Sequence, residues 1–337
     1  MSNENQLLQK LGGEAGCHRL AKEFYSRVAT DLELKPLFPG KSMRCATEEF
    51  GAFLIQFLDG DENQTQYRWW LSLRESHARF KITQKQRAAW LKQMRATLNA
   101  FNLEGETRDA LAQFFLVTSA YILGAESGEP QHEELSHRWK QQLALDQLIS
   151  DITLERDSFA IAAAKAFASR RSVLVGILAR MMEAGREELV EFVLQSIETD
   201  PELLRVKNND RALLHCAASC GCVPVVQRLL AMGMDPNVLG GGNHTPLYRV
   251  ANDCVVPSGA DVVRELVKAG ADVDHNGGVT RSTALHAAAR YGHLETAVAL
   301  LDLGASVSAR DNKGLTPLDR AKNCRKFAVA AEIEARM

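Results

Sequence analysis

The stretch Leu73-Arg74-Glu75-Ser76-His77-Ala78-Arg79-Phe80-Lys81-Ile82 decides how the first part of this chain is interpreted. It holds one histidine, apolar side chains that can flank a flat ligand, and an arginine three residues upstream of the histidine. Taken alone, a histidine in such a setting is more often structural or solvated than a ligand. The residues on both sides of the stretch must therefore decide what His77 does.

Helical periodicity runs through most of residues 5–126. Leu20, Phe24 and Val28 recur at helical spacing in a segment that ends before Pro36. Three further apolar stripes with this spacing are Ala46, Phe50, Phe53, Leu54 and Phe57, then Trp90, Leu91, Met94, Leu98 and Phe101, and finally Leu111, Phe115, Thr118 and Ile122. The periodicity lapses between Gly60 and Gln84, so we expect His77 on an irregular segment or a short helix. Because no useful alternation of period two occurs, the predicted fold class is all-α.

The length of the chain predicts more than one domain. At 337 residues it exceeds what one hydrophobic core usually holds. All four Trp, nine of the thirteen Phe and three of the five Tyr precede residue 140, so the chemistry of the core changes near there. A turn signal at 127–130 and two helical patterns after it predict a helical connector over 127–171, between a first domain at 1–126 and a second at 172–337.

Composition and charge narrow the compartment and the partners. Hydrophobic residues at 46% and charged residues at 24% describe a soluble protein, and a net charge of −2 favours neither a nucleic acid nor an anionic membrane as partner. The polar N-terminus lacks the pattern of a signal peptide, and the apolar run 114–125 is too short for membrane insertion. Seven cysteines, an odd number, predict reduced thiols in a cytoplasmic protein.

Residues 172–337 repeat themselves. Leu214, Leu247, Leu285 and Leu318 mark equivalent points at spacings of 33, 38 and 33 residues. The segments Thr245-Pro246-Leu247, Thr283-Ala284-Leu285-His286-Ala287-Ala288, Thr316-Pro317-Leu318 and Gly270-Ala271-Asp272-Val273 resemble ankyrin repeats. This resemblance implies a helical solenoid of about four repeats and a C-terminal cap, which binds another protein.

The first domain offers the groups that a haem requires. A haem needs an apolar slot, an axial ligand with a lone pair, and cations for its propionates. Only His18 and His77 precede residue 130. His18 lies among Cys17, Arg19 and Lys22 and can simply be solvated, whereas His77 lies among apolar side chains. His77 is therefore the better candidate for the iron ligand.

The order of motifs around His77 resembles the truncated haemoglobins, most closely their group II. The matching elements are Leu11-Gly12-Gly13, Phe24-Tyr25-x-x-Val28, Asp31-x-x-Leu34-x-Pro36-Leu37-Phe38-Pro39, Leu73-Arg74-x-x-His77-x-x-Phe80-x-Ile82 and Arg87-x-x-Trp90-Leu91-x-x-Met94. The resemblance implies a two-over-two helical sandwich that binds haem b, with His77 as the proximal iron ligand. It also implies that Tyr25 and Trp90 donate hydrogen bonds on the distal side to dioxygen, nitric oxide or carbon monoxide.

Elementary chemistry agrees with these distal roles. A diatomic ligand on the iron carries partial negative charge, which a phenol O–H or indole N–H stabilises in a dry pocket. By alignment Ala46 stands where other globins place a distal histidine or glutamine, and alanine cannot donate. The remaining residues expected around the haem are Phe38, Phe50, Phe80 and Met94, with Arg74 as a propionate partner.

Two other clusters have structural interpretations. His215, Cys216, Cys220 and Cys222 resemble a metal cluster, but in the ankyrin frame His215 is a capping residue and the cysteines are small packing residues. His132 and His137 lie five residues apart, so they do not share a helix face as a zinc-binding pair would.

Three classes of function remain open. The first is a haem protein that binds dioxygen and other diatomic ligands and is docked by its ankyrin repeats onto an unidentified protein. The second is an enzyme that turns over nitric oxide or reduces peroxide, for which the sequence shows no flavin or nicotinamide module as electron source. The third is a sensor in which iron ligation alters what the ankyrin surface binds. Oxygen binding or sensing is favoured over a dedicated enzyme, and a haem-free scaffold would leave the joint presence of Tyr25, His77 and Trp90 unexplained.

Overall fold

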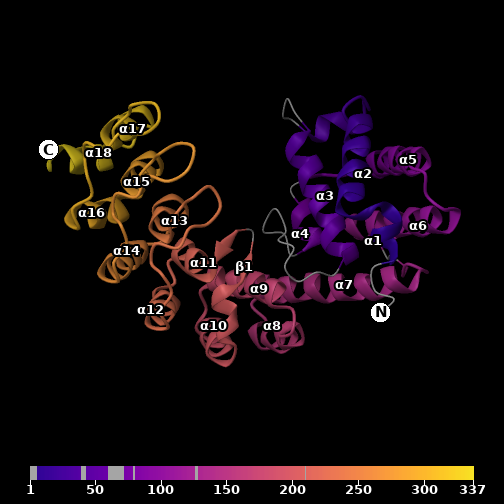
Figure 1. The fold of residues 1–337 in the computed structure, drawn as a ribbon, viewed down its shortest axis with the longest axis horizontal. Helices are drawn as coiled ribbons and strands as arrows, with labels where there is room; N and C mark the ends of the chain where they lie inside the picture. The colour runs from indigo at the N-terminus through magenta and orange to yellow at the C-terminus, as the bar shows by residue number, and fades with distance from the viewer. Residues whose placement is uncertain (1–5, 39–42, 60–71, 79, 126–127, 209) are drawn as a thin grey trace. The chain divides into compact units, whose positions relative to one another are not determined.

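The computed structural model describes residues 6–38, 43–59, 72–78, 80–125, 128–208 and 210–337. Internal contacts divide the chain into two compact units, Met1–Leu154 and Glu155–Met337 (Figure 1). Pro39 and Arg79, which belong to the quoted motifs, lie outside the described residues. None of the described helices combines the length and apolar composition that crossing a membrane requires.

Helices make up the described part of the first unit. Their bounds are α1 Gln6–Leu11, α2 Gly13–Val28, the 3-10 turn η1 Lys35–Leu37, α3 Arg44–Asp59, α4 Leu73–Ala78, α5 Gln84–Ala100, α6 Gly105–Ile122 and α7 Glu133–Thr153. Local chemistry fixes several of these ends. For example, α5 begins with a capping box in which the Gln86 N–H donates to Thr83 Oγ1 at 3.2 Å and the Thr83 N–H donates to Gln86 Oε1 at 2.9 Å.

The helices of the first unit enclose one hydrophobic core. Helix α2 packs against α3 and α5, and α5 packs against α6. Phe24, Leu54, Met94 and Phe114 lie in this core, with other apolar residues from each of these helices. The apolar stripes predicted the buried faces of these helices, and the truncated-globin fold class that the resemblance implied is confirmed.

Helix α7 also contributes to the core of the first unit. Its Leu135 and Trp139 are fully buried in the same cluster as Phe24 and Phe114. The predicted connector at 127–171 is therefore helical, but its two helices fall in different units: α7 lies in the first, and α8 Asp157–Ala164 lies in the second.

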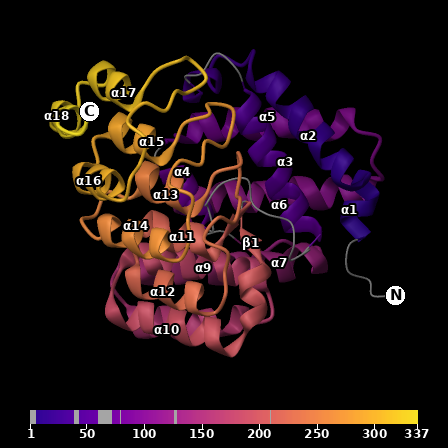
Figure 2. The ribbon, with the colours of Figure 1, turned by 60° about the vertical axis from the view of Figure 1, so that its left-hand side comes forward.

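The described part of the second unit is a helical solenoid. After α8 and the turn η2 Lys165–Phe167, its helices are α9 Arg171–Ala184, α10 Glu187–Thr199, α11 Leu213–Cys220, α12 Val223–Ala231, α13 Pro246–Asp253, α14 Gly259–Lys268, α15 Ala284–Tyr291, α16 Leu294–Asp302, α17 Pro317–Asn323 and α18 Phe327–Glu334, with a turn η3 Pro201–Arg205 after α10. Within this unit α9, α11, α13, α15 and α17 form one row, and α10, α12, α14, α16 and α18 form the other (Figure 2). Each pair buries its apolar faces against its neighbours, as the repeat pattern predicts.

One small β-hairpin interrupts the helices of the second unit. Strand β1 Lys207–Asn208 pairs antiparallel with β2 Arg211–Ala212, and Lys207 lies opposite Ala212. Two-residue strands are too short to show alternation in the sequence, which is why the hairpin was not predicted. The all-α class is nevertheless confirmed.

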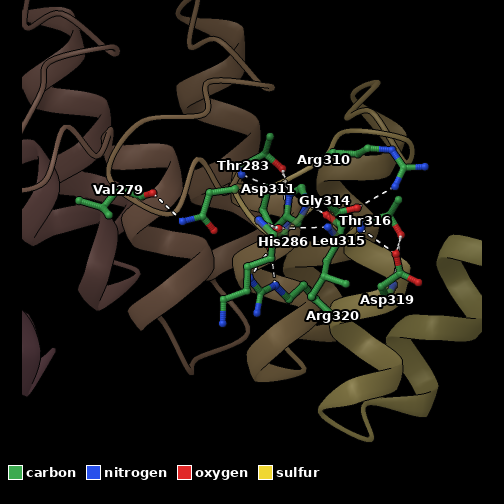
Figure 3. Close-up of polar contacts among 12 residues, drawn as sticks. Val279, Thr283, His286, Arg310, Asp311, Gly314, Leu315, Thr316, Asp319 and Arg320 are labelled. Carbon is green, nitrogen blue, oxygen red and sulfur yellow. Dashed lines mark hydrogen bonds and ion pairs between the residues drawn. The ribbon is translucent and has the colours of Figure 1, made fainter.

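Hydrogen bonds connect consecutive repeats of the solenoid. The ring of His286 accepts the Thr283 N–H at Nδ1 (3.2 Å), and its Nε2 lies 3.0 Å from Leu315 O in the next repeat (Figure 3). His215 makes the same pair of contacts, with the Ala212 N–H at 3.2 Å and His244 O at 3.0 Å. The predicted capping role of His215 is thus seen in the structure, and each ring is held in the neutral form with its proton on Nε2.

Candidate functional site

His77 lies on the short helix α4 with its imidazole hydrogen-bonded to the backbone. Its Nδ1 lies 2.8 Å from Leu73 O and 2.9 Å from Ser76 Oγ, and the Ser76 hydroxyl donates to the same carbonyl at 2.8 Å. Since a carbonyl oxygen only accepts, Nδ1 carries the proton and the lone pair lies on Nε2. This is the tautomer in which an imidazole binds a metal, with the backbone fixing the direction of the ring.

Tyr25 lies at the centre of a group of aromatic rings. Its ring centroid lies 5.1 Å from that of Phe24, 5.6 Å from that of Phe38 and 6.2 Å from that of Phe50, and each of these pairs is edge-to-face. The ring of Phe38 in turn packs against that of Phe80, with the two ring centroids 6.3 Å apart. Because the Phe80 N–H donates to His77 O at 2.9 Å, these contacts connect the Tyr25 ring to helix α4.

Trp90 joins the same group from helix α5. Its ring centroid lies 5.1 Å from that of Phe24 and 5.6 Å from that of Phe115. The ring centroids of Phe115 and Phe50 are 6.0 Å apart. The structure therefore brings together five of the predicted haem-site residues from separate elements of the first unit, namely Tyr25, Phe38, Phe50, Phe80 and Trp90.

These five aromatic side chains are only half-buried, whereas Phe24 and Phe114 behind them are fully buried. Aromatic rings gathered at one place and left partly exposed form an apolar surface that a flat ligand can cover. This surface, and the tautomer of His77 with its proton on Nδ1, are features that a haem site requires.

Burial sets the chemistry of the Tyr25 hydroxyl. Although the side chain as a whole is half-buried, its hydroxyl group is removed from water, which raises its pKa above the ordinary value of a tyrosine, and the negative charge of Glu49 acts in the same direction. The phenol therefore keeps its proton at physiological pH, so it can act as a hydrogen-bond donor.

The remaining predicted site residues lie in less direct positions. Ala46 is half-buried on α3, the helix that carries Phe50. Met94 is only 1% exposed and packs within the hydrophobic core, one turn after Trp90 on α5. Arg74 is exposed, and its guanidinium carbon lies 4.1 Å from the ring centroid of Tyr121. Haem contacts by these three residues stay predictions.

One buried residue that holds the start of α4 was missed by sequence interpretation. Asp146 of α7 is buried, and its carboxylate accepts the Leu73 N–H at the start of α4 at 2.9 Å. In the sequence Asp146 follows Leu135, Trp139 and Leu143 at helical spacing, so it is a carboxylate on the apolar side of an amphipathic helix. A charged residue at such a position is rarely left without hydrogen-bonding partners, and this signal could have identified it.

The fold and this site define a globin unit followed by an ankyrin-repeat unit. A family model described as bacterial-like globin matches residues 6–122, and two models of ankyrin repeats match residues 178–276 and 266–321. The chain is also 32% identical over 117 residues to the group 2 truncated hemoglobin YjbI of Bacillus subtilis, a match that covers 35% of this chain and 88% of that protein. The chain therefore belongs, through its N-terminal domain, to the group 2 truncated haemoglobins.

The chain also resembles parts of much longer proteins. It is 32% identical over 142 residues to the putative E3 ubiquitin-protein ligase XBAT31 of Arabidopsis thaliana, covering 38% of this chain and 30% of that protein. It is 40% identical over 94 residues to the human SH3 and multiple ankyrin repeat domains protein 1, covering 28% of this chain and 4% of that protein. The globin domain indicates haem-based binding of gas ligands, and the repeats indicate interaction with a protein.

Proposed function

We propose that this protein binds haem b with His77 as the axial iron ligand, and that Tyr25 and Trp90 hydrogen-bond the diatomic ligand. Haem, when bound, supplies an iron with a coordination position open to dioxygen, nitric oxide or carbon monoxide. The observation that carries the proposal is the bond from His77 Nδ1 to Leu73 O, because it directs the proton away from Nε2 and holds the ring in one orientation.

The other residues supply what the haem itself lacks. Phe38, Phe50 and Phe80 offer the apolar surface that excludes water, which strengthens any hydrogen bond made there. The protonated phenol of Tyr25 and the indole N–H of Trp90 are donors, which suits a ligand that carries partial negative charge. The ankyrin unit then binds a partner protein and fixes where the ligand is held or delivered.

An absorption spectrum tests this proposal. The full chain reconstituted with haem is expected to show a Soret band, and a carbon monoxide complex when reduced. His77→Ala should lose haem readily or lose the spectrum of a histidine-ligated iron, whereas the control His18→Ala, at an exposed position on α2, should keep both. A wild-type chain that takes up no haem, or a His77→Ala variant with an unchanged spectrum, would refute the proposal.

Sensing is a second candidate function, favoured by one observation. Helix α7 holds the start of α4 through Asp146 and ends at Thr153, directly before the second unit begins in the sequence. A change at α4 on iron ligation could therefore reach the start of the ankyrin unit. Amide hydrogen exchange in α7 and α8 should then differ between the reduced protein with and without carbon monoxide, and identical exchange would exclude this candidate.

A further inference from the structure

The carboxylate of Asp146 is buried, 5% exposed, and accepts hydrogen bonds from four donors. Its Oδ1 accepts the Leu73 N–H at 2.9 Å and Gln142 Nε2 at 2.9 Å, and its Oδ2 accepts the Tyr121 hydroxyl at 2.9 Å and the Arg74 N–H at 3.4 Å. A carboxylate whose two oxygens accept this many hydrogen bonds is held in one defined orientation.

Two of these four donors are the first backbone N–H groups of α4. The first N–H groups of any helix lack partners within the helix, and a cap is usually supplied by the preceding residue. In this chain the carboxylate of Asp146, on another helix, supplies part of the cap. Since α4 has only six residues, it is too short to be stable without such outside support.

A single peptide group lies between Asp146 and the imidazole of His77. The peptide group that joins Leu73 to Arg74 donates its N–H to Asp146 Oδ2, and its carbonyl accepts His77 Nδ1–H at 2.8 Å. A negative charge at the N–H end polarises the peptide and makes its carbonyl a stronger acceptor. A stronger bond at Nδ1 makes the lone pair at Nε2 more basic, which is how groups behind a ligating histidine tune a metal.

We propose that Asp146 is a positioning residue for His77, holding α4 in place and raising the basicity of the imidazole through the Leu73–Arg74 peptide. This proposal rests on the proposed role of His77 as iron ligand. The globin family match ends at residue 122, so the group that orients the iron ligand lies on a helix beyond that match. The hydrogen bonds from Tyr121, at the end of α6, and from Gln142 hold the Asp146 carboxylate in position beside the start of α4.

The test compares substitutions of Asp146 in the full chain with a matched control on the same helix. Asp146→Asn keeps the shape of the side chain but removes its charge, and Asp146→Ala removes the group that caps α4. Asp151→Asn is the control, because Asp151 is also a buried aspartate of α7 and accepts a hydrogen bond from a glutamine four residues before it. Circular dichroism and a urea midpoint confirm that each variant is folded.

Two readouts on the haem-loaded protein separate tuning from simple support. In the reduced protein, Asp146→Asn should lower the iron–histidine stretching frequency measured by resonance Raman, because the Nδ1–H bond weakens. Asp146→Ala should speed haem transfer to excess apomyoglobin by about tenfold or more, the usual effect of removing a group behind a metal ligand. Asp151→Asn should change neither. Asp146 variants with wild-type frequency and transfer rate would overturn the proposal.

A third readout does not depend on haem. In the apoprotein, Asp146→Ala should speed hydrogen exchange at the Leu73 and Arg74 amides, while Asp151→Asn should leave those amides unchanged. If the amides respond but the wild-type protein shows no iron–histidine band, His77 is not the ligand and the proposed function fails. If that band is present and the amides do not respond, the role of Asp146 fails alone.

Discussion

At the scale of single residues, the Tyr25 phenol shows how burial prepares a donor. Its pKa lies above the ordinary tyrosine value because burial disfavours the phenolate, and the charge of Glu49 acts in the same direction. The rings of Phe24, Phe38 and Phe50 around it fix the side chain without offering a competing acceptor. The proton of the phenol is therefore retained well above neutral pH.

Replacing Tyr25 by Phe should speed ligand loss. Removal of one hydrogen bond to a partly charged acceptor costs about 1–3 kcal/mol, so we expect the dioxygen dissociation rate to rise roughly five- to hundredfold. Stopped-flow mixing of the oxygenated protein with dithionite measures this rate. The wild-type rate should be the same at pH 7 and pH 9, because the phenol does not titrate between them. Equal rates in the wild-type protein and the Tyr25→Phe variant would show that the phenol does not contact the ligand.

His215 makes the stability of the ankyrin unit depend on pH. Its pKa is lowered from 6.5 to about 4, chiefly by burial and also by the nearby Arg249 and Arg211, while the bond to His244 O acts in the opposite direction. Protonation would also place a proton on Nδ1, which accepts the Ala212 N–H in the neutral ring. That hydrogen bond would then be lost. Since the pKa in the folded state lies below that of the unfolded chain, protons favour unfolding. The contribution of His215 is thus present above pH 6.5 and is lost as pH falls toward 4.

This loss should reach on the order of 3 kcal/mol at the acid end, by the conversion of the pKa difference into free energy. Urea unfolding of the ankyrin unit, followed by circular dichroism at pH 7 and pH 5, measures the change. The His215→Gln variant should be less stable than the wild-type protein at pH 7, but its free energy of unfolding should fall less between pH 7 and pH 5. A wild-type protein that is equally stable at pH 7 and pH 5 would contradict the proposed role of His215.

At the scale of elements, the sequence predicted those helices whose buried face forms a regular apolar stripe. Helices α2, α3, α5 and α6 were predicted because each buries one continuous stripe. The stripe lapses where α4 lies, so the sequence left an irregular segment or a short helix as alternatives there. The hairpin β1–β2 and the placement of α7 in the first core were not predicted, since neither two-residue strands nor the partner of an amphipathic helix leave a periodic signal. The pairing of Asp146 with Leu73 spans 73 residues, and local pattern does not encode such a contact.

The packing of α1 on α2 depends on the absence of a side chain at Gly16. A Cβ built there would lie 1.9 Å from Leu11 O, whereas the buried Leu7 and Leu11 of α1 hold that segment in the core. Alanine is ordinarily the better helix former by about 1 kcal/mol, so the steric clash must exceed this gain to destabilise. A contact this close requires a backbone shift, so the clash should prevail.

We therefore expect Gly16→Ala to destabilise the first unit by about 1–3 kcal/mol, the usual cost of overpacking. Urea unfolding of the full chain, followed by tryptophan fluorescence, checks this value because all four Trp precede residue 140. Gly105→Ala is the matched control, because a Cβ at that helical glycine meets only an ordinary contact with Arg108 at 3.7 Å. Equal effects of the two substitutions would show that α1 does not pack closely at Gly16.

At the scale of the whole molecule, the family match and the folding unit end at different residues. The bacterial-like globin model ends at residue 122, and the turn signal at 127–130 predicted a domain boundary after residue 126. In the structure the first unit extends to Leu154, because α7 buries Leu135 and Trp139 in the globin core and caps α4 through Asp146. We therefore expect the globin fold of this chain to require α7 in addition to the region that the family model matches.

A pair of shortened chains tests which boundary is right. The chain 1–154 should unfold in one cooperative transition and take up haem with the spectrum of the full chain. The chain 1–126 should be less stable by at least about 3–5 kcal/mol, the cost of removing one buried tryptophan, and should release haem faster because α4 loses its cap. Trp139→Ala in the full chain should show a similar loss, while Leu154→Ala, at a site 60% exposed, should be nearly neutral. If 1–126 matches 1–154 in both stability and haem retention, α7 belongs to the connection between the domains and not to the globin.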